Sequence, residues 1–202
     1  MPRIGTEEYK EHVRKKITNV ALEVFARKGY RQTTMSDVAK QMNVSKPTIY
    51  LYFKNKEQLL RAISETQEAW LNERLSQWID EGNLWNYKTA LENQHKPSIE
   101  NEQLLRLWLE ILSEASRNAS IKKIVVENFE IRRKIIEEAL ENRRRKKLIH
   151  PKSDSRSLSI AFITLLIGHQ VLQTLNISKS QLSQATGQLM KTMLVRSAKN
   201  PD

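Results

Sequence analysis

The sequence of 202 residues contains no cysteine and only four histidines. The missing cysteine excludes a disulfide framework, a cysteine-ligated zinc site and a thiol nucleophile. The histidines lie at His12, His95, His150 and His169, and no two have a spacing that places them on one helix face, so we expect no metal site. There is also no serine–histidine–acid signature and no phosphate-binding loop. We therefore expect a protein that is not an enzyme and needs no cofactor.

Glycine and proline are scarce, at five residues each, and they fall between long segments with helical periodicity. Val13, Ile17, Val20 and Val24 illustrate the spacing, and no strand-like alternation is sustained. The pattern predicts an all-α protein of about nine helices. Their expected ranges are 8–28, 35–42, 45–53, 56–81, 84–95, 99–117, 120–148, 154–175 and 178–196.

Long apolar runs are missing as well. The most apolar stretch, residues 160–175, is interrupted by Gly168, His169 and Gln170, and it is too short and polar to span a bilayer. The first residues lack the apolar core of a signal peptide. We expect a soluble, cytoplasmic protein without a membrane partner.

Positive charge is present in excess, with a net charge of +11. Residues 1–58 hold twelve Lys and Arg against six Asp and Glu, so under a third of the chain carries over half of the excess. A basic front segment followed by a more balanced one favours DNA binding at the front.

Residues 33–60 contain two short helical segments separated by about four residues, a spacing typical of a helix-turn-helix. Ala39 is small where the two helices would cross, and Asn43 occupies the turn, where a positive φ is needed. Ile49 and Phe53 would face inward from the second helix. Together they predict a recognition helix over residues 45–53.

Lys46, Thr48, Tyr50 and Tyr52 remain for the outer face of that helix. Lysine can donate to guanine, and a threonine methyl can contact a thymine methyl. Lys54 and Lys56 follow near the start of the next helix, where phosphates are readily bound. The alternatives are that Tyr50 and Tyr52 pack against that next helix, and that Lys54 is only solvated.

These residues resemble the DNA-binding domain of the TetR family over about residues 10–60. The resemblance rests on Ala21, Phe25, Gly29, Tyr30, Thr33-Thr34, Asp37-Val38-Ala39, Val44-Ser45-Lys46, Thr48-Ile49-Tyr50, Tyr52-Phe53, Lys56-Glu57 and Leu59-Leu60. Two departures are Asn43 and Pro47, where the family more often has glycine. The resemblance implies a helix-turn-helix domain over 1–56 and a ligand-sensing and dimerisation domain over 57–202.

The resemblance also implies roles. Thr34 and the start of the second helix would contact the DNA backbone, Lys46, Thr48 and Tyr50 would reach bases or nearby phosphates, and Tyr52 and Lys56 would hold phosphates. The full set of expected DNA-binding residues is Thr33, Thr34, Ser45, Lys46, Thr48, Tyr50, Tyr52, Lys54 and Lys56.

Candidates for a small, largely apolar effector come from apolar helices and buried polar positions. They are Trp70, Trp78, Trp85, Trp108, Leu112, Asn128, Phe129 and His169. Each can equally be plain core. Asn128 stands out because it interrupts an apolar stripe and must find a polar partner there.

The last two long helices carry apolar stripes that would form a four-helix interface between two subunits. The expected interface residues are Phe162, Leu165, Leu172, Leu182, Leu189 and Met193. A homodimer would place two recognition helices on successive turns of a palindromic double-stranded operator. The sequence thus predicts a ligand-responsive repressor. The alternatives are a helical small-molecule-binding or catalytic protein whose basic front is incidental, and a nonspecific architectural DNA binder.

Overall fold

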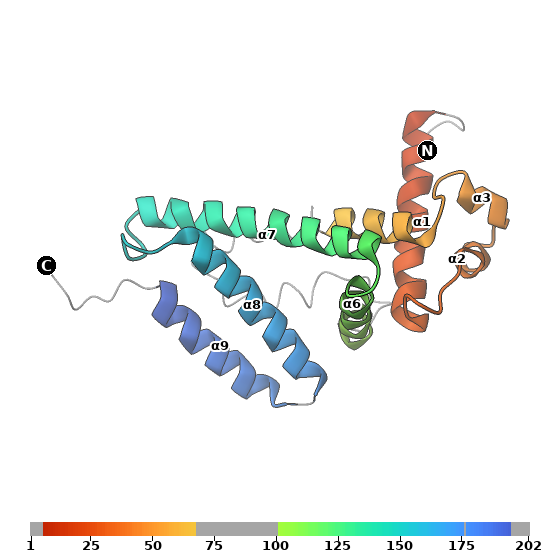
Figure 1. Ribbon diagram of the computed structural model, residues 1–202. Helices are drawn as coiled ribbons and strands as arrows, with labels where there is room; N and C mark the ends of the chain where they lie inside the picture. The colour runs from red at the N-terminus through yellow and green to blue at the C-terminus, as the bar shows by residue number, and fades with distance from the viewer. Residues whose placement is uncertain (1–5, 68–100, 176, 195–202) are drawn as a thin grey trace, which may run out of the picture. The chain divides into compact units, whose positions relative to one another are not determined.

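A computed structural model describes residues 6–67, 101–175 and 177–194 (Figure 1). The described regular elements are all helical, with no β-strand among these residues. They are α1 (Glu7–Lys28), α2 (Met35–Gln41), α3 (Lys46–Tyr50), a helix over 56–67, α6 (Asn101–Ala115), α7 (Ala119–Arg145), α8 (Ser155–Thr174) and α9 (Lys179–Leu194). The all-α prediction is confirmed, whereas the helix expected over 84–95 lies outside the described residues.

The chain divides into two compact units. One holds residues 1–67 and 95–125, and the other holds residues 68–94 and 126–202. The first unit extends beyond the predicted DNA-binding domain because α6 packs against α1. The predicted boundary at residue 56, between a DNA-binding domain and a ligand-sensing and dimerisation domain, stays a prediction.

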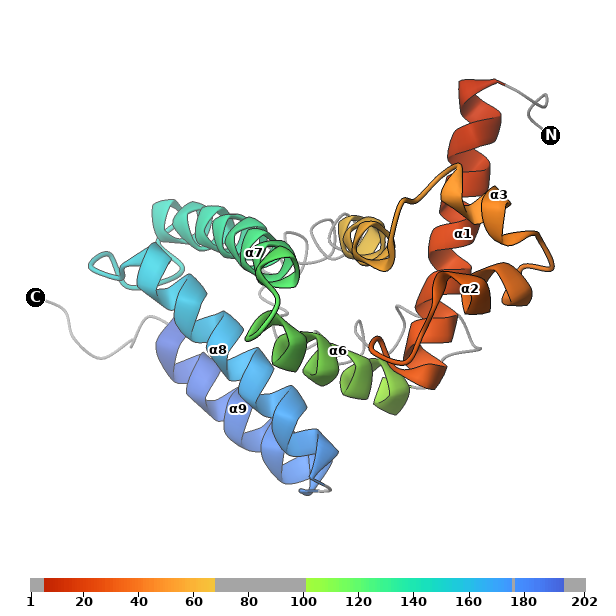
Figure 2. The same cartoon turned by 45° about the vertical axis from the view of Figure 1, so that its right-hand side comes forward.

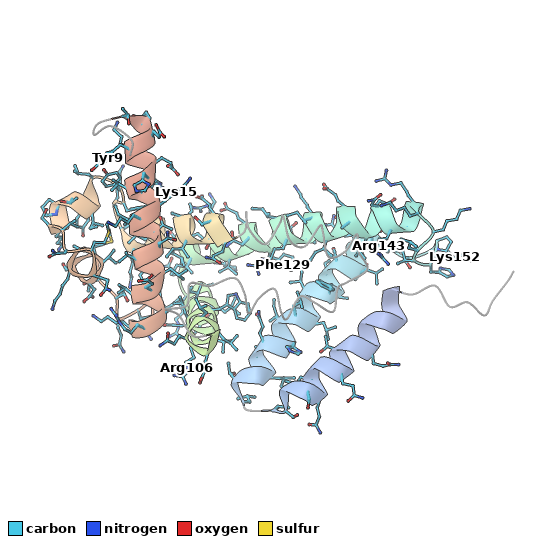
Figure 3. The ribbon with its side chains drawn as sticks, turned by 180° about the vertical axis from the view of Figure 1, so that it is seen from behind. Tyr9, Lys15, Arg106, Phe129, Arg143 and Lys152 are labelled. Atoms are coloured by element: carbon cyan, nitrogen blue, oxygen red, sulfur yellow. The ribbon has the colours of Figure 1, made fainter. Side chains whose placement is uncertain are left out.

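Helix α1 begins and ends where its local sequence favours it. The Thr6 hydroxyl accepts a hydrogen bond from the Tyr9 N–H at 3.1 Å, and acidic residues occupy the first turn. Gly29 follows the last turn with φ of 84° and ψ of 154°, and its N–H donates to the Phe25 carbonyl. Figure 3 shows the side chains of Tyr9 and Lys15 on this helix.

Helix α2 begins with a capping box. The Thr34 hydroxyl accepts from the Asp37 N–H at 3.2 Å, and the Asp37 carboxylate accepts from the Thr34 N–H at 2.8 Å. Thr34 is therefore the N-cap of α2. Thr33 is only 2% exposed, and its hydroxyl donates to the Gly29 carbonyl at 2.7 Å.

The core of the first unit holds α2 and α3 against α1 (Figures 1 and 2). Its fully buried side chains are Ile17, Ala21, Phe25, Val38, Ile49 and Phe53. Tyr30 adds an edge-to-face ring contact with Phe25, with centroids 5.2 Å apart. The small Ala39, also buried, lets the two short helices approach as predicted.

In the second unit, α8 and α9 lie side by side (Figures 1 and 2). His169 of α8 and Thr186 of α9, both buried, share a hydrogen bond of 3.1 Å. Among the described helices, α8 alone is long and apolar enough to cross a membrane by length and composition. This differs from the expectation that the apolar stretch is too short and polar to span a bilayer. Core helices of soluble proteins meet the same criterion, and 28% of the window Ser155–Leu172 is buried within the chain.

Candidate nucleic-acid interface

The recognition helix starts at Ser45, which occupies the N-cap position, and Pro47 lies in the first turn, where no backbone N–H is needed. The α-helix ends at Tyr50, three residues earlier than predicted. Its hydrogen-bonded turns nevertheless continue, because Phe53 N–H donates to the Ile49 carbonyl at 3.0 Å. The side chains of the predicted range 45–53 therefore keep a helical arrangement.

The turn before this helix depends on Asn43, whose φ is 56°. This left-handed conformation lets the Val44 N–H reach back to the Ala39 carbonyl at 3.0 Å. Asparagine tolerates the conformation better than other non-glycine residues. The predicted role of Asn43 is confirmed, and it fixes the angle at which α3 leaves α2.

Successive helical residues rotate by about 100°. Because Ile49 and Phe53 are fully buried, the opposite side of the helix lies at Pro47 and Leu51. Leu51 is 83% exposed and Tyr50 is 44% exposed. The outermost line of the recognition helix is thus apolar. Leu51 was not among the predicted DNA-binding residues, which are all polar or aromatic.

Predicted DNA-binding residues flank this apolar line on both sides. Lys46 and Tyr50 lie on one flank, with the Lys46 Nζ 5.7 Å from the centre of the Tyr50 ring. Thr48 lies on the other flank and shares a hydrogen bond of 2.8 Å with the Ser45 hydroxyl. The structure therefore brings Ser45, Lys46, Thr48 and Tyr50 together on one segment, where Thr48 is half-buried and the other three are exposed.

Tyr52 is half-buried, and its backbone is anchored by a residue outside the predicted site. Arg14 of α1 donates to the Tyr52 carbonyl at 3.1 Å, and its guanidinium lies 4.3 Å from the centre of the Phe53 ring. Cation–π contact and the carbonyl bond together hold the C-terminal end of the recognition helix to α1. An isolated arginine in a basic helix gives no sequence signal of this role.

Among the predicted DNA-binding side chains, Thr33 and Lys56 bind the main chain of the turn that follows α1. Thr33 is buried, as described above, and Lys56 donates from Nζ to the carbonyls of Tyr30 and Arg31, both at 3.1 Å. Lys54 is exposed, next to Asn55, which caps the helix over 56–67 by accepting from the Gln58 N–H at 2.9 Å. Gln58 in turn accepts from the Lys54 N–H rather than from the Asn55 N–H expected for a capping box.

The effector candidates fall into different parts of the chain. Trp70, Trp78 and Trp85 lie outside the described residues, Trp108 and Leu112 are half-buried in the first unit, and Asn128 and Phe129 are half-buried in the second. Figure 3 shows Phe129 on α7. His169 is buried and bonded to Thr186 of α9. These residues stay predictions.

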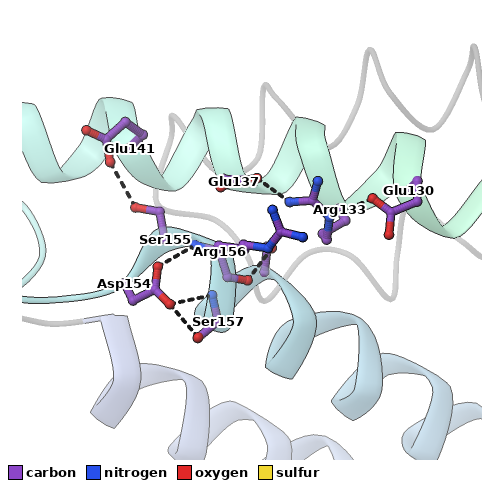
Figure 4. A network of polar contacts seen from close by, with 9 residues as sticks. Glu130, Arg133, Glu137, Glu141, Asp154, Ser155, Arg156 and Ser157 are labelled. Atoms are coloured by element: carbon purple, nitrogen blue, oxygen red, sulfur yellow. Dashed lines mark hydrogen bonds and ion pairs between the residues drawn. The ribbon is translucent and has the colours of Figure 1, made fainter.

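Arg133 of α7 is a buried polar residue that sequence analysis overlooked. It is only 4% exposed, and it pairs with Glu130 and Glu137 one turn away on either side (Figure 4). Both acidic partners come from its own helix, so the ion pairs form without any ligand. In the same unit, Glu141 accepts a hydrogen bond from Ser155 at 3.1 Å, which joins the end of α7 to the start of α8.

The predicted dimer residues differ in exposure. Leu172 and Leu189 are 37% and 47% exposed, and Leu165 and Leu182 are half-buried. Phe162 is buried inside the single chain, so its ring is not offered to a partner, and the Met193 side chain is not described.

Comparisons with known proteins agree with this geometry. A model of the family described as bacterial regulatory proteins, tetR family, matches residues 17–63. The Fatty acid metabolism regulator protein of Bacillus subtilis (strain 168) is 41% identical over 75 residues, which are 37% of this chain and 39% of that protein. The HTH-type transcriptional regulator YhgD of the same organism is 35% identical over 141 residues, which are 69% of this chain and 65% of that protein.

The chain therefore spans less than two thirds of the length of these curated relatives. Among solved structures, Salmonella enterica GusR superimposes with a TM-score of 0.74 at 19% sequence identity, covering 95% of this chain and 99% of that chain. This similarity concerns the fold. The matched residues show that the chain carries a DNA-binding domain of the tetR family of bacterial regulatory proteins over residues 17–63.

Proposed function

We propose that this protein is a sequence-specific, DNA-binding transcriptional regulator that acts in the cytoplasm rather than an enzyme. The observation that carries this proposal is the exposed outer side of the recognition helix, with Lys46, Thr48 and Tyr50 around Leu51, on a fully buried apolar base. A cation, a hydroxyl and an aromatic ring on a helix that fits the major groove supply both phosphate and base contacts.

The proposed active form is a homodimer formed through α8 and α9. Leu172 and Leu189 support it, because large apolar side chains on the outside of two long helices gain most by being covered. A two-fold dimer would present two recognition helices to a palindromic operator. Phe162 is left out of the proposed interface because it is already buried within the chain.

The proposed regulation is repression that a small, largely apolar effector relieves. Occupying an operator excludes other proteins from it, so repression is the simplest consequence of binding. The apolar character of α6 supports an apolar effector, with Trp108 and Leu112 as candidate contacts. Such an effector must bind the DNA-incompetent conformation more tightly, since equal affinity for both conformations shifts no equilibrium.

An electrophoretic mobility-shift titration with the duplex upstream of the protein's own gene tests the proposal. Lys46→Ala and Tyr50→Ala should each lower affinity at least tenfold, because each removes a contact on the proposed DNA-binding side. Lys152→Ala removes an exposed positive charge between α7 and α8 and should leave affinity unchanged.

Equal affinity of folded Lys46→Ala, Tyr50→Ala and parent proteins would overturn this assignment. Equal affinity of the parent for operator and random duplex would instead indicate a nonspecific architectural binder. Failure to bind any duplex at low salt would indicate a helical binding protein without a DNA function.

A further inference from the structure

The turn that follows α1 is held by α6 through its main chain. The Tyr30 N–H donates to Glu110 Oε2 at 2.9 Å, and the Arg31 N–H donates to Glu110 Oε1 at 2.8 Å. Both oxygens of one carboxylate thus accept from two successive backbone N–H groups. Hydrogen bonds to an ionised acceptor are stronger than neutral ones, so this is a firm attachment.

Lys56 binds the same two residues through their carbonyls. Its Nζ donates to the carbonyls of Tyr30 and Arg31, both at 3.1 Å, and lies 4.5 Å from the centre of the Tyr30 ring. An ammonium group has three donors. Two of them serve these carbonyls, and the ammonium also makes a cation–π contact with the Tyr30 ring.

Gly29 leaves room for the Glu110 carboxylate beside this turn. A Cβ atom at this position would lie 2.7 Å from Glu110 Oε2, and φ here is 84°. A side chain would therefore collide with the carboxylate as well as strain the backbone. Arg31 adds a second link to α6 through an ion pair with Glu114, in which the Arg31 Nε lies 3.2 Å from the Glu114 Oε1.

The turn formed by residues 29–31 leads directly into the helix-turn-helix. Thr33 bonds to the Gly29 carbonyl, Thr34 caps α2, and Lys28 forms an ion pair with Asp37 in the first turn of α2. Displacement of the 29–31 turn would therefore move the start of α2 and, with it, the recognition helix packed on α2.

We propose that Glu110 and Lys56 are positioning residues that clamp the 29–31 turn from its N–H and carbonyl sides, and that Lys56 does not contact a DNA phosphate. This inference rests on the proposed DNA-binding function. It reverses the role that the family resemblance implies for Lys56 and leaves Lys54 and Lys46, both exposed, as the phosphate-contacting lysines nearby.

The salt dependence of operator affinity separates the two roles of Lys56. Removing a phosphate contact reduces by about 1 the magnitude of the slope of log association constant against log salt concentration. Lys54→Gln and Lys46→Gln should show such a reduction. Lys56→Gln should lower affinity about tenfold at fixed salt with the slope of the parent protein. A slope reduced by about 1 in Lys56→Gln, or an unchanged affinity, would overturn the proposal.

Amide hydrogen exchange, measured residue by residue by NMR on the full chain without DNA, tests the Glu110 side. In Glu110→Gln the amides of Tyr30 and Arg31 should exchange at least tenfold faster, because the side chain then offers one oxygen for two N–H groups and a neutral acceptor binds each more weakly. Glu102→Gln is the matched control, since Glu102 is exposed on the same helix and pairs with Arg106. It should leave both amides unchanged.

The DNA affinity of these two variants supplies a second readout. Each removes one negative charge, which by electrostatics alone would strengthen binding to DNA. Glu110→Gln should nevertheless weaken binding, whereas Glu102→Gln should not. Unchanged exchange at Tyr30 and Arg31, or equal affinities of the two variants, would overturn the clamp. If Glu110→Gln does not fold, Glu110→Asp, which retains the charge on a shorter side chain, takes its place with the same expected outcomes.

Failure of the clamp and failure of the proposed function are distinguishable. If the parent protein binds no duplex, the DNA-binding function fails, while the exchange measurements still report on the contacts of the 29–31 turn. If the parent binds DNA and Lys56→Gln behaves like Lys54→Gln, only the clamp fails.

Discussion

At the scale of single residues, Asp37 makes three interactions at the start of α2. Its carboxylate accepts hydrogen bonds from the Thr34 N–H and the Thr34 hydroxyl, and it forms an ion pair with Lys28 of α1. The hydrogen bond from Lys28, followed by those from Thr34, holds the pKa of Asp37 well below its ordinary value. A carboxylate stabilised in this way makes the folded state depend on its charge.

We expect Asp37→Asn to lower the melting temperature at neutral pH and to have little effect in strong acid. A lowered folded-state pKa contributes stability that is fully present above the unfolded-state pKa of about 3.9 and is lost as the pH falls through the folded-state value. Thermal unfolding followed by circular dichroism between pH 7 and pH 2 measures this. A difference between parent and variant that stays constant across the range would contradict the assignment, and exposed Glu102→Gln serves as the control.

Among the described residues, two that are not glycine have positive φ: Asn43 at 56° and Lys147 at 58°. Lys147 ends α7 in the same way that Asn43 ends α2, because the Leu148 N–H reaches the Arg143 carbonyl at 3.0 Å. The left-handed conformation destabilises a lysine by about 1–2 kcal/mol. Glycine avoids this strain, but its more flexible unfolded chain offsets part of the resulting stabilisation.

We therefore expect Lys147→Gly to stabilise the protein by about 0.5–1 kcal/mol and Asn43→Gly by less, because asparagine already tolerates this conformation. Urea unfolding monitored by circular dichroism provides the comparison. Lys147→Ala keeps the strain and should match the parent. Destabilisation by Lys147→Gly would show that the lysine side chain itself stabilises the helix end.

At the scale of the element, the recognition helix separates its packing side from its outer side. Ile49 and Phe53 are fully buried and Leu51 is 83% exposed, so the two sides can be altered independently. Arg14 holds the end of the helix to α1 through the Tyr52 carbonyl. A rigid base beneath an exposed leucine suits contact with a thymine methyl.

Leu51→Ala should change the free energy of unfolding by less than about 0.5 kcal/mol, because the side chain packs against little. It should lower operator affinity about fourfold, the equivalent of one buried methyl group at about 0.8 kcal/mol. Replacing thymines of the operator by deoxyuridine, one at a time, should weaken the parent at one position and leave Leu51→Ala unaffected there. Uniform insensitivity of the parent to deoxyuridine would contradict this contact.

At the scale of the whole molecule, DNA affinity and subunit association should be linked. Two half-sites on one operator need two recognition helices held at a fixed spacing. Leu172→Glu and Leu189→Glu place a charge on the proposed α8–α9 interface and should shift the protein from dimer to monomer, with at least a hundredfold loss of operator affinity.

Sedimentation velocity measures the association state directly. Leu148→Glu, at a residue 45% exposed beyond the end of α7, is the matched control and should stay dimeric. Because dimers gain stability with concentration, the melting temperature of the parent should also rise with protein concentration, whereas that of Leu172→Glu should not. A dimeric Leu172→Glu protein would place the interface elsewhere.

The sequence by itself determined the features that depend on neighbouring residues. Periodic apolar residues predicted the bounds of α1 and α2 to within a residue, and Asn43, Ala39, Ile49 and Phe53 take the roles expected of them. These features follow from helical periodicity, steric limits on φ and capping, which act over a few residues and leave a mark on the local sequence.

Only the tertiary structure decided which side chains are free to meet DNA. Lys56 is held by Tyr30 and Arg31, and Glu110 contacts Tyr30 across 80 positions of sequence. Both contacts are made to backbone N–H and carbonyl groups, which every residue except proline carries. A partner of that kind leaves no pattern of side chains in the sequence, so the folded chain alone reveals it.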